Sequence, residues 1–104
     1  MNSEDLSVKI FKALGHPIRL QIVKSLLNES RCVCEINRDF EYSQANLSQH
    51  LKILREAGIL ENKKIGVEMH YRVKLKGIKT LLEIMDQTAI EYFETLDFKP
   101  NENR

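Results

Sequence analysis

Apolar side chains recur at helical spacing along the N-terminal part of the chain. A first helix is expected to begin at Ser3, whose hydroxyl suits an N-cap, and to end at Gly15. Pro17 suits the first turn of a second helix, because the N–H that proline lacks would be unpaired there. A short third helix is expected within residues 32–40, where apolar residues again fall near one face.

The fourth expected helix separates apolar and polar side chains onto opposite faces. Ser43 can cap its start and Gly58 can end it. Leu47, Leu51 and Leu54 lie at i, i+4 and i+7 and are expected to face the core. The opposite face holds small or amide side chains near the start and cations further along: Gln44, Ala45, Ser48, Gln49, Lys52 and Arg55. Amides can hydrogen-bond adenine edges and cations can neutralise phosphates, so this face suits a DNA major groove, although an ordinary solvated face has the same spacing.

After this helix the period changes from helical to alternating, which predicts a β-hairpin. Residues 60–64 form the first expected strand, Gly66 allows the turn, and the second strand places Met69 and Tyr71 on one face. Lys63 and Lys64 then lie near the hairpin tip, where they can reach phosphates beside the groove. A hairpin that follows a recognition helix is a wing.

The last expected helix, residues 74–96, has an apolar surface too wide to remain exposed. A small domain cannot cover both this surface and the stripe of the first helix, so we expect a homodimer packed through the first and last helices. The residues expected in this interface are Leu6, Ile10, Leu82, Met85, Ala89 and Tyr92. The fold class predicted from the pattern is mainly α with a small β-hairpin, a winged helix-turn-helix.

Composition and charge agree with a small DNA-binding domain. The 104 residues suit one domain, expected over residues 1–98, with a disordered tail at 99–104 and no room for a separate catalytic domain. No apolar run approaches the roughly 20 residues that span a bilayer, and the start does not resemble a signal peptide, so we expect a soluble cytoplasmic protein without a membrane partner. Residues 43–76 contain seven Lys or Arg against three Asp or Glu, a local net charge of +4. A basic block of this kind suits phosphate contacts, although a solvated face is the commoner explanation for it alone.

Several segments together resemble one family. FKALGHPIRLQIVKSLL, CVCEI, SQANLSQHLKILREAGIL and a KK-x-G-x-x-x-x-YRV hairpin occur in the order found in the arsenic-repressor (ArsR/SmtB) family of winged-helix regulators, and the resemblance covers roughly residues 5–95. It implies a dimeric transcriptional repressor, not an enzyme, that binds double-stranded operator DNA with an inverted repeat. It also implies that a metal or metalloid inducer releases the operator and that DNA binding requires no cofactor. By position, the family's base-reading residues correspond to Gln44, Ala45, Ser48 and Gln49.

Cys32 and Cys34 are the only cysteines and the candidate metal ligands. Residues i and i+2 point to roughly opposite sides of a regular helix or strand, so both thiolates can bind one ion only where the backbone is irregular. Thiolates select soft ions, which makes As(III) or Sb(III), and less so Cd(II) or Pb(II), the expected inducers. The Cys-Val-Cys segment matches the family's arsenic-type sensing motif, but Asn37 stands where a third cysteine would be expected. A small thiol, a water or a cysteine of the partner subunit would then complete a trigonal site.

Other interpretations of the cysteines remain open at this point. Two thiols can be small buried hydrophobes, or a redox pair that forms a disulfide, trisulfide or persulfide. A thiol oxidoreductase or an interaction module is the weakest alternative, because the chain has neither a Cys-x-x-Cys motif nor a paired base and nucleophile. His16, His50 and His70 have no common ligand spacing and are expected to be structural or surface residues.

Overall fold

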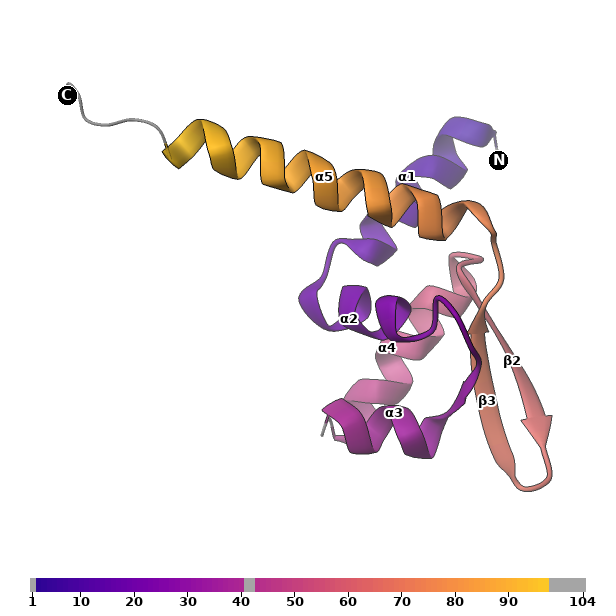
Figure 1. Ribbon diagram of the computed structural model, residues 1–104. Helices are drawn as coiled ribbons and strands as arrows, with labels where there is room; N and C mark the ends of the chain where they lie inside the picture. The colour runs from indigo at the N-terminus through magenta and orange to yellow at the C-terminus, as the bar shows by residue number, and fades with distance from the viewer. Residues whose placement is uncertain (1, 41–42, 98–104) are drawn as a thin grey trace.

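The computed structural model describes residues 2–40 and 43–97, and it has the helical order that the sequence predicts, followed by a hairpin and a last helix (Figure 1). The tail expected at residues 99–104 lies outside this described part. The elements are α1 (Ser3–Leu14), α2 (Pro17–Ser25), β1 (Arg31–Cys32), α3 (Val33–Phe40), α4 (Gln44–Glu56), β2 (Leu60–Ile65), β3 (Glu68–Val73) and α5 (Gly77–Asp97).

The helix caps follow the sequence signals with one correction. Asn2, not Ser3, caps α1: its side chain accepts a hydrogen bond from the Asp5 N–H at 2.9 Å, and the Asp5 carboxylate accepts one from the Asn2 N–H at 3.5 Å. This reciprocal pair satisfies two N–H groups that a serine at the next position would leave open. Ser43 caps α4 as expected, with its hydroxyl 3.2 Å from the Asn46 nitrogen.

A third strand joins the predicted hairpin. β1 pairs antiparallel with β3, and the strand order is β1-β3-β2, with Arg31 opposite Tyr71 and Cys32 opposite His70. β1 has two residues, which is too short to show an alternating pattern in the sequence. Its pairing ties the start of α3 to the wing.

The core lies between the helices and the base of the wing. The side chains that are essentially inaccessible come from α2, α3, α4 and the start of β2: Ile22, Val23, Leu26, Ile36, Leu47, Leu51, Leu54, Ile59 and Leu60. Among the described residues, no polar or charged side chain is buried. The polar groups of α4 and the wing therefore remain at the surface, where a ligand can reach them.

α5 begins later than the sequence predicts. The Lys74 N–H donates to the Ile59 carbonyl at 2.8 Å, which keeps the chain extended at the base of the hairpin until the helix starts at Gly77. Only Ile78 and Leu82 of α5 are buried within the protomer, and the rest of the helix projects from the body (Figure 1). No described helix is long and apolar enough to cross a membrane.

Leu82, one of the residues expected in the dimer interface, is largely covered by its own protomer. It is 4% exposed and belongs to the core, beside an apolar groove that also touches α1 and α2, so it is already covered within one protomer. Met85, one turn further along, is 47% exposed. The exposed large apolar side chains of α1 and α5 are Leu6, Val8, Phe11, Ile84, Met85, Ile90, Tyr92, Phe93 and Leu96.

Candidate functional site

The outer face of α4 is open along its whole length. All six side chains expected to face DNA, from Gln44 to Arg55, are exposed, while Leu47, Leu51 and Leu54 are at most 2% exposed on the opposite side. Burying these leucines fixes the rotation of α4 about its axis.

A groove of about 480 Å³ separates α4 from the wing. Gln44, Ser48, Lys52 and Arg55 contribute one wall. The opposite wall contains side chains of β3 and the first residue of α3: Met69, Tyr71 and Val33. The helix and the wing thus form one concave surface, and Lys52 and Arg55 are the cationic side chains that line it.

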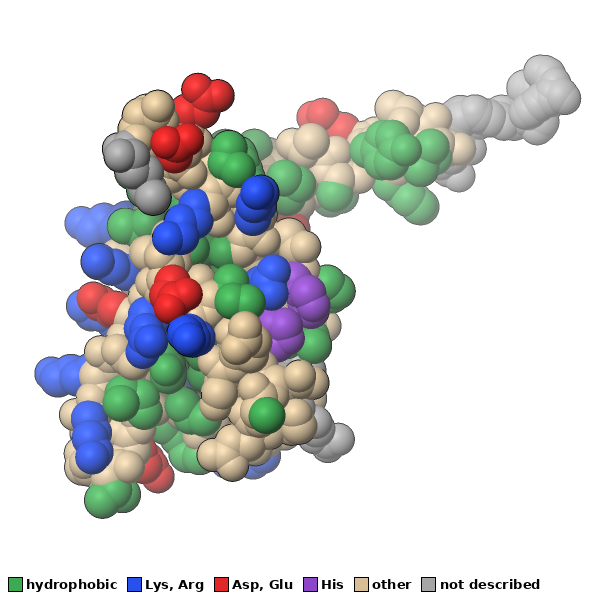
Figure 2. Space-filling model, turned by 180° about the vertical axis from the view of Figure 1, so that it is seen from behind, with side chains coloured by type: hydrophobic (Ala, Val, Ile, Leu, Met, Phe, Trp, Pro, Cys, Tyr) green, Lys and Arg blue, Asp and Glu red, His purple; other side chains and the backbone are tan. Residues whose placement is uncertain are grey.

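The two lysines near the wing tip occupy different faces of the hairpin. Lys64 lies opposite Met69 in the β2–β3 register, and Lys63 lies opposite His70. Directly opposed residues share a face and neighbours alternate, so Lys64 is on the groove side with Met69 and Lys63 is on the other side. Gly66, with φ of +64°, makes the turn beyond them. Figure 2 shows Lys and Arg side chains gathered along the edge of the molecule that includes the wing.

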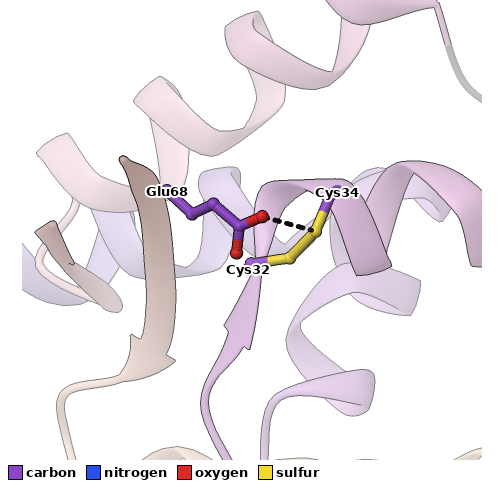
Figure 3. Close-up of side chains that lie close together, drawn as sticks. All are labelled: Cys32, Cys34 and Glu68. Atoms are coloured by element: carbon purple, nitrogen blue, oxygen red, sulfur yellow. Dashed lines mark hydrogen bonds between the residues drawn. A yellow bond between two sulfur atoms is a disulfide. The ribbon is translucent and has the colours of Figure 1, made fainter. Parts of the chain in front are cut away.

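The two cysteines meet where a strand changes into a helix. β1 ends at Cys32 and α3 begins at Val33, and this irregular backbone brings the two sulfur atoms together in a disulfide with Cα atoms 5.3 Å apart (Figure 3). Cys32 is buried and Cys34 is exposed. The opposed orientation that a regular helix or strand would impose is therefore absent here.

Cys32 also has a structural role in α3. Its Sγ atom accepts a hydrogen bond from the Glu35 N–H at 3.2 Å, and the Cys32 N–H donates to the Glu35 carboxylate at 3.0 Å. This is the reciprocal geometry of a capping box, with sulfur in place of a hydroxyl. A chemical change at this sulfur therefore acts directly on the first turn of α3.

Glu68 is a third potential ligand, and the sequence pattern did not indicate it. The Sγ atoms of Cys32 and Cys34 and a Glu68 carboxylate oxygen all lie within 4.8 Å of one another, and Cys34 Sγ is 3.9 Å from Glu68 Oε2 (Figure 3). Glu68 is the first residue of β3, on the strand that pairs with β1. Only the pairing of β1 with β3 brings Glu68 near the cysteines, and the sequence does not show that pairing.

A second polar cluster connects α1, α2 and α4. The Arg19 guanidinium donates to the Ala13 carbonyl at 2.6 Å and to His50 Nδ1 at 3.3 Å. The His16 ring lies 4.6 Å from that of His50, centre to centre, and its Nδ1 accepts a hydrogen bond from the Ile18 N–H at 3.1 Å. Both histidines thus have structural roles, and both rings accept a hydrogen bond at Nδ1.

Burial lowers the pKa of His50, and the nearby His16 and Arg19 lower it further. A protonated His50 would lose its acceptor nitrogen and would place a second positive charge beside the Arg19 guanidinium. The neutral ring is therefore the form that this packing stabilises.

Comparisons with known proteins identify relatives across most of the chain. The family model described as "Bacterial regulatory protein, arsR family" matches residues 16–62, from the α2 cap to β2. An uncharacterised HTH-type transcriptional regulator of Methanocaldococcus jannaschii, MJ1325, is 36% identical over 88 residues, which cover 84% of this chain and 99% of that protein. The arsenical resistance operon repressor of Escherichia coli is 41% identical over 70 residues, which cover 65% of this chain and 59% of that protein.

A solved structure shares the architecture. The homodimeric winged helix-turn-helix DNA-binding domain of Mb0332 from Mycobacterium bovis superimposes with a TM-score of 0.79 at 25% identity, covering 91% of this chain and 88% of that one. The relatives and neighbours are regulators, not enzymes.

The lowered pKa of His50 predicts a pH-dependent stability. Because the folded pKa lies below the ordinary value of about 6.5, the contribution of neutral His50 is complete above pH 6.5 and is lost as the pH falls through the folded pKa. Urea unfolding at a series of pH values should show a free energy of unfolding that decreases below pH 6.5, with a shallower decrease in His50→Gln. His70→Gln, on the wing, is the matched control and should follow the wild type. An unchanged slope in His50→Gln would show that this ring does not contribute.

Proposed function

The chain belongs to the arsR family of bacterial regulatory proteins, and on this basis we propose that it is a homodimeric transcriptional repressor. It binds an inverted-repeat operator in the cytoplasm and releases it when a soft metal or metalloid, As(III) first among them, binds Cys32 and Cys34. The observation that supports DNA binding most strongly is the outer face of α4, exposed along its length above a buried leucine stripe and adjoining the wing.

α4 has the properties of a recognition helix. Gln44, Ser48 and Gln49 offer donors and acceptors to base edges near its N-terminus, and Lys52 and Arg55 follow with positive charge. A DNA strand that passes through the groove between α4 and the wing would bring its phosphates to Lys52, Arg55 and Lys64. The helix then lies in the major groove and the wing contacts the neighbouring backbone.

The projecting part of α5 supports a homodimer. The radius of gyration is 16.7 Å, against about 13 Å for a compact domain of this size, because α5 extends an apolar surface beyond the body (Figure 2). A second copy covers these side chains with an identical surface, as a two-fold interface requires. Two α4 helices then meet two half-sites whose centres are separated by roughly 10 bp or a multiple.

The cysteine site suits a soft ion once the disulfide is reduced. Two thiolates bound to one ion at about 2.3 Å each lie roughly 3.8 Å apart at a tetrahedral angle, so the two bonded sulfurs must separate on reduction. A Glu68 oxygen already lies within 4.8 Å of both. The E. coli relative is named for arsenical resistance. Because Cys32 caps α3, the helix that precedes α4, ligation at its sulfur changes the support of the recognition helix.

The disulfide itself favours a second candidate function, a dithiol redox switch. A low-molecular-weight disulfide would oxidise the two thiols and be reduced to two thiols in exchange. A persulfide would do the same and release one thiol and one hydrogen sulfide. In this case oxidation, not ion binding, drives operator release.

Gln49→Ala should weaken operator binding by about 1–3 kcal/mol and relax the base preference, because an amide that pairs with a base edge is lost. Gln87→Ala, the same change on α5, should have no effect. Fluorescence anisotropy with the operator and with base-substituted operators measures both quantities. Equal losses of affinity for all operator sequences would show that Gln49 does not contact the bases.

Lys63→Ala and Lys64→Ala should weaken binding to all sequences and reduce the slope of log affinity against log salt by about one each. The loss should be larger at Lys64, which shares the groove face with Met69. Salt slopes identical to that of the wild type would exclude the wing from the phosphate contacts.

Met85→Glu should give a monomer at micromolar concentration and abolish operator binding, because a carboxylate would be buried across the subunit interface. Gln87→Glu introduces the same charge two residues away, on the opposite side of α5, and should remain dimeric. Sedimentation velocity distinguishes the two variants. A dimeric, DNA-binding Met85→Glu protein would contradict an interface at this surface.

Cys32→Ser and Cys34→Ser should fold and bind the operator nearly as the wild type does but should not release it with arsenite under reducing conditions. Serine is a good N-cap, so Cys32→Ser retains the acceptor for the Glu35 N–H. The wild type should lose about 5- to 150-fold in operator affinity, a typical allosteric coupling.

Anisotropy with and without arsenite, and with a persulfide, separates the two functions. Release of both Ser variants by arsenite would place the sensor elsewhere. Release of the wild type by persulfide alone would favour the redox switch.

A further inference from the structure

We propose that Glu68 is the third protein ligand of the cysteine site, so that inducer binding fastens the wing to the start of α3. This inference rests on the proposed function, because it assumes that Cys32 and Cys34 bind the inducer. It assigns the missing ligand of a trigonal site to the same chain, without a free thiol or a cysteine of the partner subunit.

The strand register explains why Glu68 lies beside the cysteines. Arg31 pairs with Tyr71 and Cys32 with His70, so the same antiparallel register, continued by two residues, sets Cys34 against Glu68. The chain has turned into α3 at that point and makes no further ladder hydrogen bonds. Side chains, not backbone groups, therefore meet there, at 3.9 Å between Cys34 Sγ and Glu68 Oε2.

The surroundings leave the carboxylate available. The Glu68 side chain is 54% exposed, and its ion-pair partner, His70 Nε2, is 3.9 Å away, which is long for a hydrogen bond. Cys34 is also exposed, so an ion can enter from solvent and meet the buried sulfur of Cys32 last. A small movement of the Glu68 side chain brings its oxygen into contact with an ion held by both sulfurs.

The donor set of two thiolates and one carboxylate accommodates As(III) without a change of oxidation state. Arsenious acid, As(OH)₃, loses its three hydroxyl groups as water. The two thiols supply two of the protons required and solvent supplies the third. Two As–S bonds and one As–O bond to Glu68 form. A divalent ion such as Cd²⁺ would bind the same three ligands with the loss of the two thiol protons.

Ligation would link the two segments that form the wall of the groove opposite α4, namely the start of α3 and β3. Val33 follows Cys32 directly, Met69 follows Glu68, and both line that groove. Glu68 is also two residues beyond the Gly66 turn, in the hairpin that contains Lys64. A bridge from the sulfurs through the ion to Glu68 thus fixes the wing in one position relative to the start of α3, and a wing held there could not adjust to DNA bound in the groove.

Glu68→Gln tests this proposal, with Glu61→Gln as the matched control. Both changes remove one negative charge from the same hairpin, and Glu61 is paired with Arg72, away from the cysteines. The reduced full-length variants are titrated with arsenite and with Cd²⁺ by calorimetry. Hydrogen exchange of residues 63–69 and operator release are measured in parallel, after thermal melts have verified folding.

In the wild type and in Glu61→Gln, arsenite should slow exchange in residues 63–69 and release the operator. Glu68→Gln should bind arsenite and Cd²⁺ about 10- to 100-fold more weakly, show no slowing in the wing and retain the operator. Glu68→Cys, which supplies a third thiolate, should restore the slowing and bind arsenite more tightly than the wild type.

A Glu68→Gln protein that equals the wild type in affinity, wing exchange and release would overturn the assignment of Glu68 while leaving Cys32 and Cys34 as the sensor. A wild type that neither binds nor responds to either ion would instead overturn the proposed function, and this inference with it.

Discussion

The orientation of α4 is the constraint on which the other features depend. Leu47, Leu51 and Leu54 are buried against α2 and β2, and each buried leucine contributes about 1.5–3 kcal/mol relative to an exposed one. With this side fixed, the remaining face of the helix has one outward direction. The groove, the contact with the wing and the proposed contacts with bases all lie on this outward face of α4.

The same helix is connected to α1 by polar contacts. Arg19 of α2 donates to the Ala13 carbonyl, at the C-terminal end of α1, and to the ring of His50 in α4. The face of α1 that carries Phe11 adjoins the apolar groove beside α5. One guanidinium thus joins the end of α1 to α4.

The cysteine segment combines two demands at a single turn of backbone. Cys32 must accept the Glu35 N–H to start α3, and its sulfur must remain available for the chemistry that we propose. The strand-to-helix change satisfies both, because it turns the two sulfurs to one side while β1 stays paired with β3. The proposed ion site, the cap of α3 and the strand that pairs with the wing thus all include Cys32.

The sequence by itself determined the order of the helices and the hairpin, the outward face of α4 and the alternation of the wing, because these depend on local periodicity and on helix-start signals such as Ser43 and Pro17. It also indicated that both cysteines could bind one ion only where the backbone is irregular. Only the tertiary structure decided that β1 exists and that Leu82 is covered within the protomer. The tertiary structure alone placed Glu68 beside Cys34. These features depend on which segments meet in space, and a two-residue strand or one carboxylate on an alternating hairpin has no periodic signal that would reveal its partner.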